Sequence, residues 1–387
     1  MTRNVSFDIC QVSSNQKNMT TEEYLLSLLR ASLWQREKVP VGTCQLLAAT
    51  FALAREHTVA AFVAHQFISG QSQLVADQEG GTMRQALVVQ MMQTEQTHKV
   101  MHAKFSHLLH ELASLFRRHG IRYAVFKGYA VASHYPQPFL RTMGDVDFYV
   151  VPQDFNRAQR IIEQEWNLTI ERDDLDKHDS FSLQGVRFEM HRSIETFGKA
   201  RAQKVFDAWI ESVVSKSSSA IAIGDELLAV LPPLADVVVV FKHLFNHLLV
   251  EGVGLRQVAD LAVLLNEYEA DIDKHALRDM LDRLGYLRAF DAIVAMLHQY
   301  LGLSCAEAYA PLTDKNIHYA DKIYRMIMDS GNFGRKAYTH HAVSYMKSIE
   351  TAYRAFRHCL FAFKLIPSEV LAFIPRRIGI TIQKYRK

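Results

Sequence analysis

Three acidic residues stand where neighbouring β-strands could bring their carboxylates together. Asp145 and Asp147 are two apart in the run Asp-Val-Asp-Phe-Tyr-Val-Val, and alternate side chains leave the same face of a strand. Glu189 lies in Val-Arg-Phe-Glu-Met-His, where apolar residues alternate with polar ones. Converging carboxylates bind Mg²⁺, and phosphoryl or nucleotidyl transfer needs divalent ions that bridge phosphates. The pattern therefore predicts Asp145, Asp147 and Glu189 as the catalytic, metal-binding residues of such a reaction.

A β-prone run upstream leads directly into Lys127 and Gly128. The glycine would let backbone N–H groups approach a phosphate closely, and a helix beginning there would add partial positive charge. Lys127 would add a formal charge at the same point. Asp-x-Asp and Lys-Gly patterns are each common at solvated strand ends and turns. Their order along the chain, with the glutamate-bearing hairpin following, is what favours a functional site.

Three further residues could contact phosphates, and each has an alternative structural role. Arg141 could neutralise phosphate charge, or pair with Asp145 or a loop carbonyl. His191 shares the predicted face of Glu189, and it could support the metal-binding carboxylates, contact a nucleotide or be an ordinary rim histidine. Arg256 could face a nucleotide across a cleft, or form an ion pair with Asp260 four residues further along a helix.

Two histidine pairs have the i, i+4 spacing of metal ligands on a helix. His243 and His247 lack an evident third ligand, and we interpret them as packing or cleft residues. His98 and His102 lie in a helical stretch rich in Gln, Lys and Thr, and we expect them to face solvent.

The elements predicted to position these residues form a small α/β module between Ile121 and Ile194. Strands are expected at 123–126, 145–151, 180–183 and 186–191, with a helix at 155–166. Helical periodicity precedes the module, with one long helix predicted from Gln85 to Arg118. Helices are expected after it, near 227–240 or 234–249 and at 255–268, 274–284 and 286–301. The predicted fold class is α+β, with a helical region at 1–120, a catalytic module at 121–215 and a helical domain at 220–387.

Composition sets outer limits on function. The chain has 387 residues and a net charge of +3, so overall charge says nothing about nucleic acid. Four isolated cysteines indicate a reduced, cytoplasmic protein, and the N-terminus is too polar for a secretory signal. No apolar run approaches the ~20 residues of a membrane span. The residues from Arg354 onward include eight Lys or Arg and only one acid. This basic tail could contact a membrane surface or RNA, although packing on its own domain is favoured.

Three sequence stretches together resemble a known family. They are Phe-Lys-Gly-Tyr-Ala from Phe126, Leu-Arg-Thr-Met-Gly-Asp-Val-Asp-Phe-Tyr-Val from Leu140, and Phe-Glu-Met-His from Phe188. The chain resembles the uncharacterised nucleotidyltransferase family of bacteria, within the DNA polymerase β-like superfamily. The likeness continues in Gly-Val-Gly-Leu-Arg-Gln-Val-Ala-Asp from Gly252 and covers roughly residues 100–270.

The resemblance implies a role for each matching position. Asp145 and Asp147 match the metal-binding pair, and Glu189 matches a third carboxylate that either binds the ion or deprotonates the acceptor. Lys127 and Gly128 stand where much of the superfamily has Gly-Ser for the triphosphate. Tyr129 follows in place of that serine, so it becomes a candidate nucleotide-binding residue whose fit is in question.

The resemblance also implies a reaction. A nucleoside monophosphate would pass from a nucleoside triphosphate, with ATP the expected donor, to an acceptor hydroxyl, and pyrophosphate would leave. Mg²⁺ is the expected cofactor and Mn²⁺ the alternative. A small molecule or sugar is favoured as acceptor over RNA or protein. Two alternatives stay open, namely a degenerate nucleotide-binding regulatory protein and a toxin-like enzyme that modifies RNA or protein.

Overall fold

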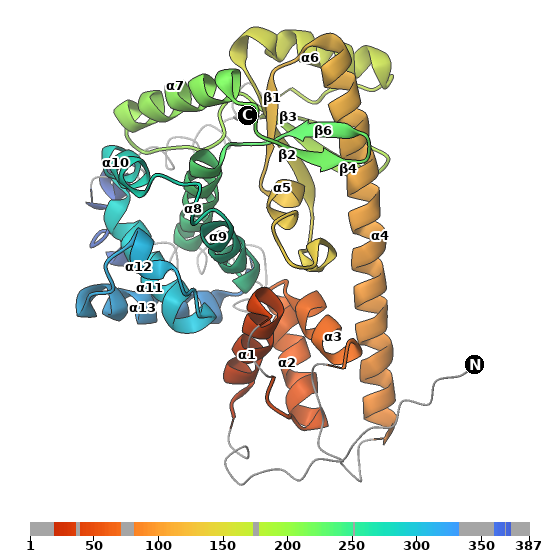
Figure 1. Cartoon of the computed structure of the whole chain (residues 1–387), viewed down its shortest axis with the longest axis vertical. Helices are drawn as coiled ribbons and strands as arrows, with labels where there is room; N and C mark the ends of the chain where they lie inside the picture. Colours follow the sequence, from red (N-terminus) through yellow and green to blue (C-terminus); the bar gives the residue numbers. More distant parts are fainter. Residues whose placement is uncertain are drawn as a thin grey trace, which may run out of the picture.

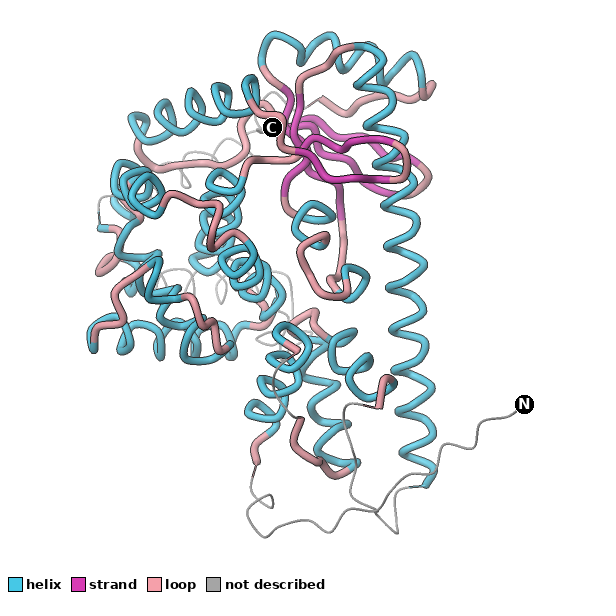
Figure 2. The backbone as a smooth tube through the Cα atoms, viewed as in Figure 1, coloured by secondary structure: helices cyan, strands magenta, loops and turns pink. Residues whose placement is uncertain are grey.

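A small β-sheet lies against one end of a single long helix, with helical layers around both. The computed structural model describes residues 19–35, 39–70, 81–172, 178–250, 252–332, 360–367 and 369–372. Three short helices pack beside the far end of the long helix, and the C-terminal helices form a separate layer on the other side of the sheet (Figure 1). The predicted α+β class, with a mixed sheet flanked by helical regions, is confirmed (Figure 2).

The sheet has the strand order β1-β2-β4-β3 and mixes parallel and antiparallel pairs. β2 pairs antiparallel with β1 and parallel with β4, and β3 and β4 form an antiparallel hairpin. The strands are β1 (Tyr123–Phe126), β2 (Asp145–Val150), β3 (His178–Leu183) and β4 (Val186–His191). α6 (Pro152–Glu165) makes the crossover that a parallel β2–β4 pair requires. All four strands were predicted close to these bounds.

Alternation along the strands separates a dry face from a polar one. Val146, Phe148 and Phe188 are buried in one apolar cluster together with residues of α4 (Gly81–His119) such as Leu112 and Phe116. Residues at the intervening positions, Asp145 and Asp147 among them, leave the opposite face of the sheet. α4 confirms the predicted long helix and ends at Gly120, whose positive φ of 58° suits a left-handed cap.

Helices before and after the module follow the sequence pattern closely. Thr20 and Glu23 form a reciprocal capping box at the start of the first helix, as their spacing suggests. The N-terminal helices are α1 (Thr21–Trp34), α2 (Cys44–Glu56) and α3 (Ala60–Ile68). The later helices are α7 (Ala200–Lys216), α8 (Pro233–Val250), α9 (Leu255–Glu267), α10 (Lys274–Leu284), α11 (Leu287–Leu301), α12 (Ala306–Tyr309) and α13 (Asp314–Ser330). The expected helices at 234–249, 255–268, 274–284 and 286–301 are thus confirmed to within one residue at each end.

A hairpin of β5 (Ala220–Ile223) and β6 (Glu226–Ala229) corrects the expected helix near 227–240. Gly224 makes the turn at a φ of 63°, and Leu228 is fully buried in the cluster beneath α4. Glu226 anchors the hairpin through an ion pair of 2.7 Å with Arg117 of α4. α8 therefore begins at Pro233, where the proline suits the first turn of a helix.

The basic tail lies mostly outside the described residues. Within 360–367 and 369–372, Leu365 and Ile366 are buried in the helical core. Glu369 is 1% exposed, and its Oε2 accepts a hydrogen bond of 2.8 Å from the backbone N–H of Gly198. This part of the tail packs on its own protein, as favoured. No helix in the described part of the chain is both long and apolar enough to cross a membrane.

Asp236, in the first turn of α8, should make stability depend on pH. Burial raises the pKa of this carboxyl to about 7, and the nearby Asp260 adds to the effect. The folded protein then holds a proton that the unfolded chain releases, so stability falls as pH rises from about 4 to about 7. The free energy of unfolding of Asp236→Asn, measured in urea, should therefore increase relative to that of the wild type by about 1.4 kcal/mol per pH unit between pH ~5 and pH ~7. A difference that stays constant over that range would contradict the raised pKa.

Candidate active site

Asp145, Asp147 and Glu189 face one cavity of about 250 Å³. The parallel register of β2 and β4 places Asp147 directly opposite Glu189, and Asp145 is two residues earlier on the same face. Lys127, Gly128, Arg141, His191 and Arg256 line the same cavity. Residues of α8 and α9 complete the lining, namely Val240, His243, His247, Gln257 and Asp260. The structure therefore brings together every predicted site residue except Tyr129.

Asp147 is the best-compensated carboxylate of the three. His191 Nε2 lies 2.8 Å from Asp147 Oδ1 and donates a hydrogen bond to it. Burial opposes ionisation of Asp147, but Lys127 and the hydrogen bond from His191 hold its pKa well below the ordinary range. Asp147 is consequently a permanent anion at the centre of the site.

Asp145 and Glu189 are crowded by that charge. Burial raises the pKa of Asp145, and repulsion from Asp147 raises it further. The same two causes, in the same order, raise the pKa of Glu189. A divalent cation among these oxygens would relieve the repulsion and the loss of solvation together. The donor set, three carboxylates on adjacent strands, fits a hard ion such as Mg²⁺.

Lys127 and Gly128 form the turn between β1 and α5 (Gly128–Ala132). Lys127 has a φ of 57° and Gly128 a φ of 36°, and a Cβ on Gly128 would lie 3.3 Å from the backbone oxygen of Asp145. The glycine therefore lets this turn approach the start of β2. α5 has only five residues, so most of the positive charge here comes from Lys127 itself. Burial opposes that charge, yet Asp147 and Glu195 raise the pKa of Lys127 above its ordinary value.

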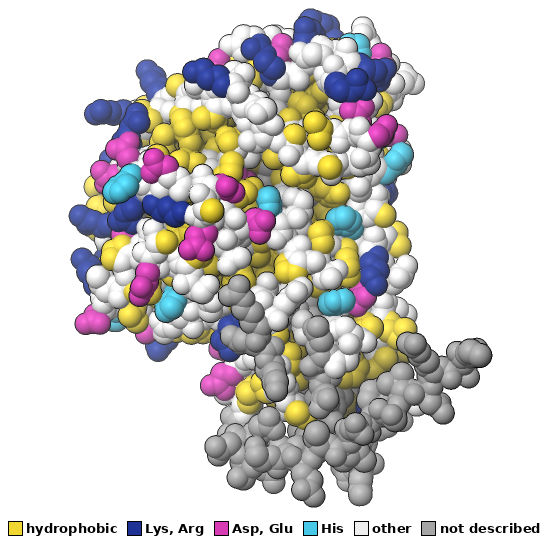
Figure 3. All heavy atoms as spheres, in the orientation of Figure 1, with side chains coloured by type: hydrophobic (Ala, Val, Ile, Leu, Met, Phe, Trp, Pro, Cys, Tyr) yellow, Lys and Arg dark blue, Asp and Glu magenta, His cyan; other side chains and the backbone are white. Residues whose placement is uncertain are grey.

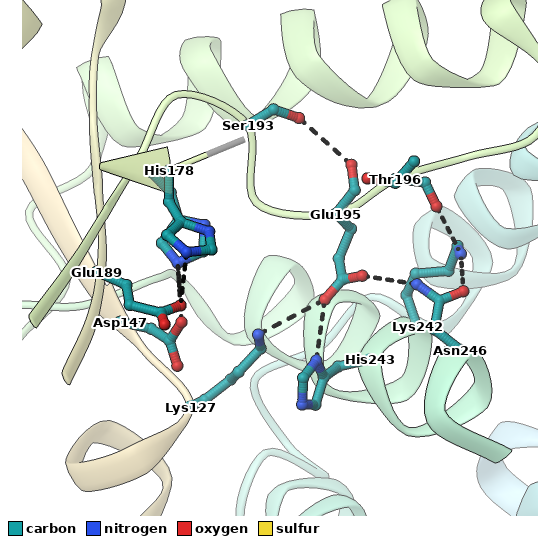
Figure 4. Close-up of polar contacts among 11 residues, drawn as sticks. Lys127, Asp147, His178, Glu189, Ser193, Glu195, Thr196, Lys242, His243 and Asn246 are labelled. Carbon is teal, nitrogen blue, oxygen red and sulfur yellow. Dashed lines mark hydrogen bonds and ion pairs between the residues drawn. The ribbon is translucent and has the colours of Figure 1, made fainter. Parts of the chain in front are cut away.

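Glu195, which sequence analysis did not identify, organises a second row of polar groups behind Lys127 (Figure 4). It is 1% exposed and lies in the loop after β4. Its Oε1 is 3.7 Å from Lys127 Nζ and 3.3 Å from His243 Nδ1. Its Oε2 accepts a hydrogen bond of 2.8 Å from the side-chain amide of Asn246. A lone glutamate in an aperiodic loop gives no sequence signal. The only indication was that His243 and Asn246, three residues apart, share one face of α8.

His243 is held as a neutral imidazole. Burial lowers its pKa to about 3, with the charge of Lys127 as the next cause. Its Nδ1 faces the carboxylate of Glu195, so that nitrogen carries the proton. The interpretation of His243 and His247 as cleft residues is consistent with their place in the cavity wall.

Arg141 and Asp260 form a buried ion pair that ties the loop before β2 to α9. Arg141 Nη2 is 2.8 Å from Asp260 Oδ2, both side chains are 5% exposed, and Tyr135 donates a hydrogen bond of 2.8 Å to the same carboxylate. Among the described residues, Asp260 therefore pairs with Arg141 rather than with Arg256. Burial and the neighbouring Arg141 lower the pKa of Arg256 to about 10, which leaves it charged near neutral pH.

The turn between α2 and α3 is hydrogen-bonded to two segments that border the cavity, the loop before β2 and the start of α9. Thr58, with a φ of 56°, accepts a hydrogen bond of 3.0 Å from Thr142 Oγ1 at its backbone oxygen. The backbone oxygen of His57 accepts a hydrogen bond of 3.4 Å from the backbone N–H of Arg256. Arg256 Nη1 in turn donates 3.3 Å to the backbone oxygen of Thr142. The N-terminal helices thus hold both the loop before β2 and the start of α9.

Tyr129 lies outside this cavity lining, so the structure does not place it with the other predicted nucleotide-binding residues. Its hydroxyl donates 3.2 Å to Ser106, and its ring stacks on His102 with the centroids 5.1 Å apart. Successive residues of a helix point about 100° apart, so Gly128 meets the cavity while Tyr129 meets α4. His102 is half-buried by this contact, and His98 is half-buried beside Phe139, so the expectation that they face solvent was wrong.

Fold and site together define an α+β protein with three carboxylates on adjacent strands of a small mixed sheet, facing a polar cavity. The chain belongs to the uncharacterised nucleotidyltransferase family, whose profile matches residues 15–302. Among solved structures, the chain is similar to an antigenic nucleotidyltransferase-like protein from Paracoccidioides brasiliensis, at 12% identity and a TM-score of 0.34, over 55% of this chain and 96% of that chain. No curated protein matches the sequence.

Asp260→Asn should destabilise the fold strongly. The change leaves the buried guanidinium of Arg141 without its anionic partner, and breaking such a pair from one side typically costs ~3–5 kcal/mol. The measurement is the free energy of unfolding in urea. Asp225→Asn is the control, because Asp225 is exposed where it pairs with His110, and its midpoint should barely move. Equal effects of the two substitutions would refute the structural role of the Arg141–Asp260 pair.

Asparagine at the two aspartates should move stability in opposite directions in EDTA at pH 7. Asp145→Asn removes a half-buried charge that is crowded by Asp147 and should raise the midpoint of thermal unfolding. Asp147→Asn removes the partner of His191 and of Lys127 and should lower it. Shifts of the same sign in both variants would show that the charge balance described for the cavity is incorrect.

Proposed function

We propose that this protein transfers a nucleoside monophosphate from a nucleoside triphosphate, with ATP as the donor, to a hydroxyl of a small acceptor. The observation that carries the proposal is the register of β2 and β4, which sets Glu189 opposite Asp147 on one face of the sheet, above a cavity lined by Lys127. Membership of the family supports the reaction class. The donor, the metal and the acceptor are parts of the proposal.

Asp145, Asp147 and Glu189 would hold Mg²⁺, or Mn²⁺ in its place. Their oxygen ligands and their mutual repulsion suit a hard divalent ion. Such an ion supplies charge neutralisation at the phosphates when it is bound.

The remaining groups of the cavity bind and orient the phosphates. Lys127 extends toward the carboxylates from the β1–α5 turn and would pair with the triphosphate. Arg256 lies across the cavity on α9 and provides a second cation. Arg141 is engaged by Asp260, so we assign it to holding the loop that leads into Asp145 of β2 rather than to binding phosphate.

The proposed step balances as an in-line displacement. The acceptor oxygen forms a bond to the α-phosphorus, the bond from that phosphorus to the pyrophosphate oxygen breaks, and pyrophosphate leaves with the electron pair. The proton of the hydroxyl passes to a carboxylate. Glu189 suits this role because it stands opposite Asp147 on the neighbouring strand and faces the same cavity.

The acceptor would enter from the side of α8 and α9. His243, His247 and Gln257 supply hydrogen-bonding groups there, which suits a sugar-like or other hydroxylated molecule. A cavity of about 250 Å³ is small, which favours a small acceptor over a folded RNA or protein. On the face drawn in Figure 3, acidic and basic side chains are interspersed rather than gathered into the basic surface that nucleic acid would need.

The first test compares the wild type with Asp145→Asn/Asp147→Asn. Each nucleoside triphosphate is added with Mg²⁺ or with EDTA, and thermal unfolding is followed. A ligand at a hundred times its dissociation constant stabilises a fold by ~2.7 kcal/mol. We expect a magnesium-dependent shift with ATP in the wild type and none in the double variant.

Pyrophosphate release with a panel of sugars and polyols then tests transfer. Release by the wild type and its loss in the double variant would support the proposal.

The second candidate is a regulatory protein that binds nucleotide without transfer. It is favoured by the orientation of Tyr129, whose hydroxyl points toward α4 and so is not available in the cavity. Magnesium-dependent ATP binding without pyrophosphate release from any acceptor would favour it.

A further inference from the structure

Two histidines and a glutamate converge at the outer edge of the carboxylate group. His178 of β3 is the cross-strand partner of His191 on β4, and Glu189 is two residues before His191 on the same face. One ligand atom from each of the three residues lies within 4.8 Å of the others. His178 is not among the residues assigned to nucleotide or magnesium, so it gives this cluster a composition different from that of the Asp145–Asp147 pair. Figure 4 shows His178 beside Glu189 and Asp147.

The spacing of these atoms is that of a metal centre. His178 Nε2 is 3.5 Å from Glu189 Oε2, and His191 Nε2 is 3.7 Å from the same oxygen. Ligands ~2.1 Å from a tetrahedral ion lie ~3.4 Å from one another. Both separations from the glutamate oxygen are close to that value, and the two histidine ligand atoms lie within 4.8 Å of each other, so small side-chain movements would let the three donors meet one ion. The side chains are 17%, 17% and 1% exposed for His178, Glu189 and His191, which leaves an approach from solvent.

The chemistry of the donors selects the kind of metal. Imidazole nitrogen suits Zn²⁺, Co²⁺ and related transition-metal ions, whereas Mg²⁺ prefers oxygen ligands and keeps its waters. Two imidazoles and one carboxylate are also a ligand set that zinc sites use, with further positions left open.

We propose that His178, Glu189 and His191 form a binding site for a transition-metal ion of the zinc type, separate in selectivity from the magnesium site and sharing Glu189 with it. An ion bound there takes the Nε2 of His191 that now contacts Asp147, and it draws Glu189 away from Asp145 and Asp147. Occupancy of the site therefore opposes the arrangement of three carboxylates proposed for transfer. That consequence rests on the proposed function, whereas the binding site itself does not.

The test measures Zn²⁺ binding by calorimetry and Co²⁺ binding by visible absorption, on the full chain with neither nucleotide nor Mg²⁺ present. We expect one ion per chain, with visible cobalt absorption that appears on binding to the nitrogen and oxygen ligands of the site. Millimolar Mg²⁺ should not displace the ion. No binding by the wild type at micromolar concentrations would overturn the proposal.

Histidine variants then assign the ligands. His178→Ala and the milder His178→Gln should each weaken Zn²⁺ binding at least tenfold, and thermal unfolding in EDTA shows whether they remain folded. His247→Ala is the matched control, because His247 lines the same cavity and has a histidine four residues away on α8. Its zinc affinity should match that of the wild type. Zinc binding kept in both His178 variants, or lost in His247→Ala, would overturn the assignment whatever the outcome of the pyrophosphate assay.

Discussion

On the polar face of the sheet, acidic and basic side chains follow one another in layers, and the packing of the surrounding elements depends on keeping each buried charge next to an opposite one. Burial raises the pKa of Asp145 and of Glu189, and repulsion from the neighbouring Asp147 raises both further. Lys127 faces them, and it is backed in turn by Glu195. A buried cation and a buried anion each cost several kcal/mol unless they are paired. The layers of opposite charge therefore have to be assembled together.

The second layer of anions connects the C-terminal helices to the strands that carry the three carboxylates. Glu195 contacts His243 and Asn246 of α8, and Asp260 of α9 pairs with Arg141 in the loop before β2. These contacts tie each cation near the cavity to an element outside the sheet. The C-terminal helices consequently act as the support that holds Lys127 and Asp145 in place, and they form the wall facing the expected acceptor.

The sequence was informative wherever the structure depends on residues close together in the chain. Period-two alternation placed Asp145, Asp147 and Glu189 on strands, and helical periodicity gave α4 and α8 to α11 within a few residues. Contacts between distant segments gave no such signal. Arg256 and Asp260 have helical pairing distance, yet Arg141 pairs with Asp260 because the loop before β2 packs on α9.

The same reason explains the remaining differences. Tyr129 directly follows Lys127 and Gly128 in sequence, but its side chain packs against α4, on the other side of α5 from the cavity. The hairpin at 220–229 is apolar enough to continue into the following helix, and it becomes a strand pair because Leu228 is buried beneath α4 and Glu226 pairs with Arg117. Glu195 owes its importance to residues of α8, some fifty positions later.

The contacts around the cavity join segments that are synthesised early to segments that are synthesised much later. The backbone oxygen of His57 bonds to Arg256, 199 residues later, and Arg141 cannot form its ion pair with Asp260 until α9 has been made. At the usual pace of synthesis, about 5–20 residues per second, the chain from the end of β4 to the end of α9 takes ~4–15 s to emerge. The carboxylates of the growing chain are therefore made before the enclosure around them, and a polypeptide interrupted in that interval has the acidic strands without the walls that would confine a nucleotide.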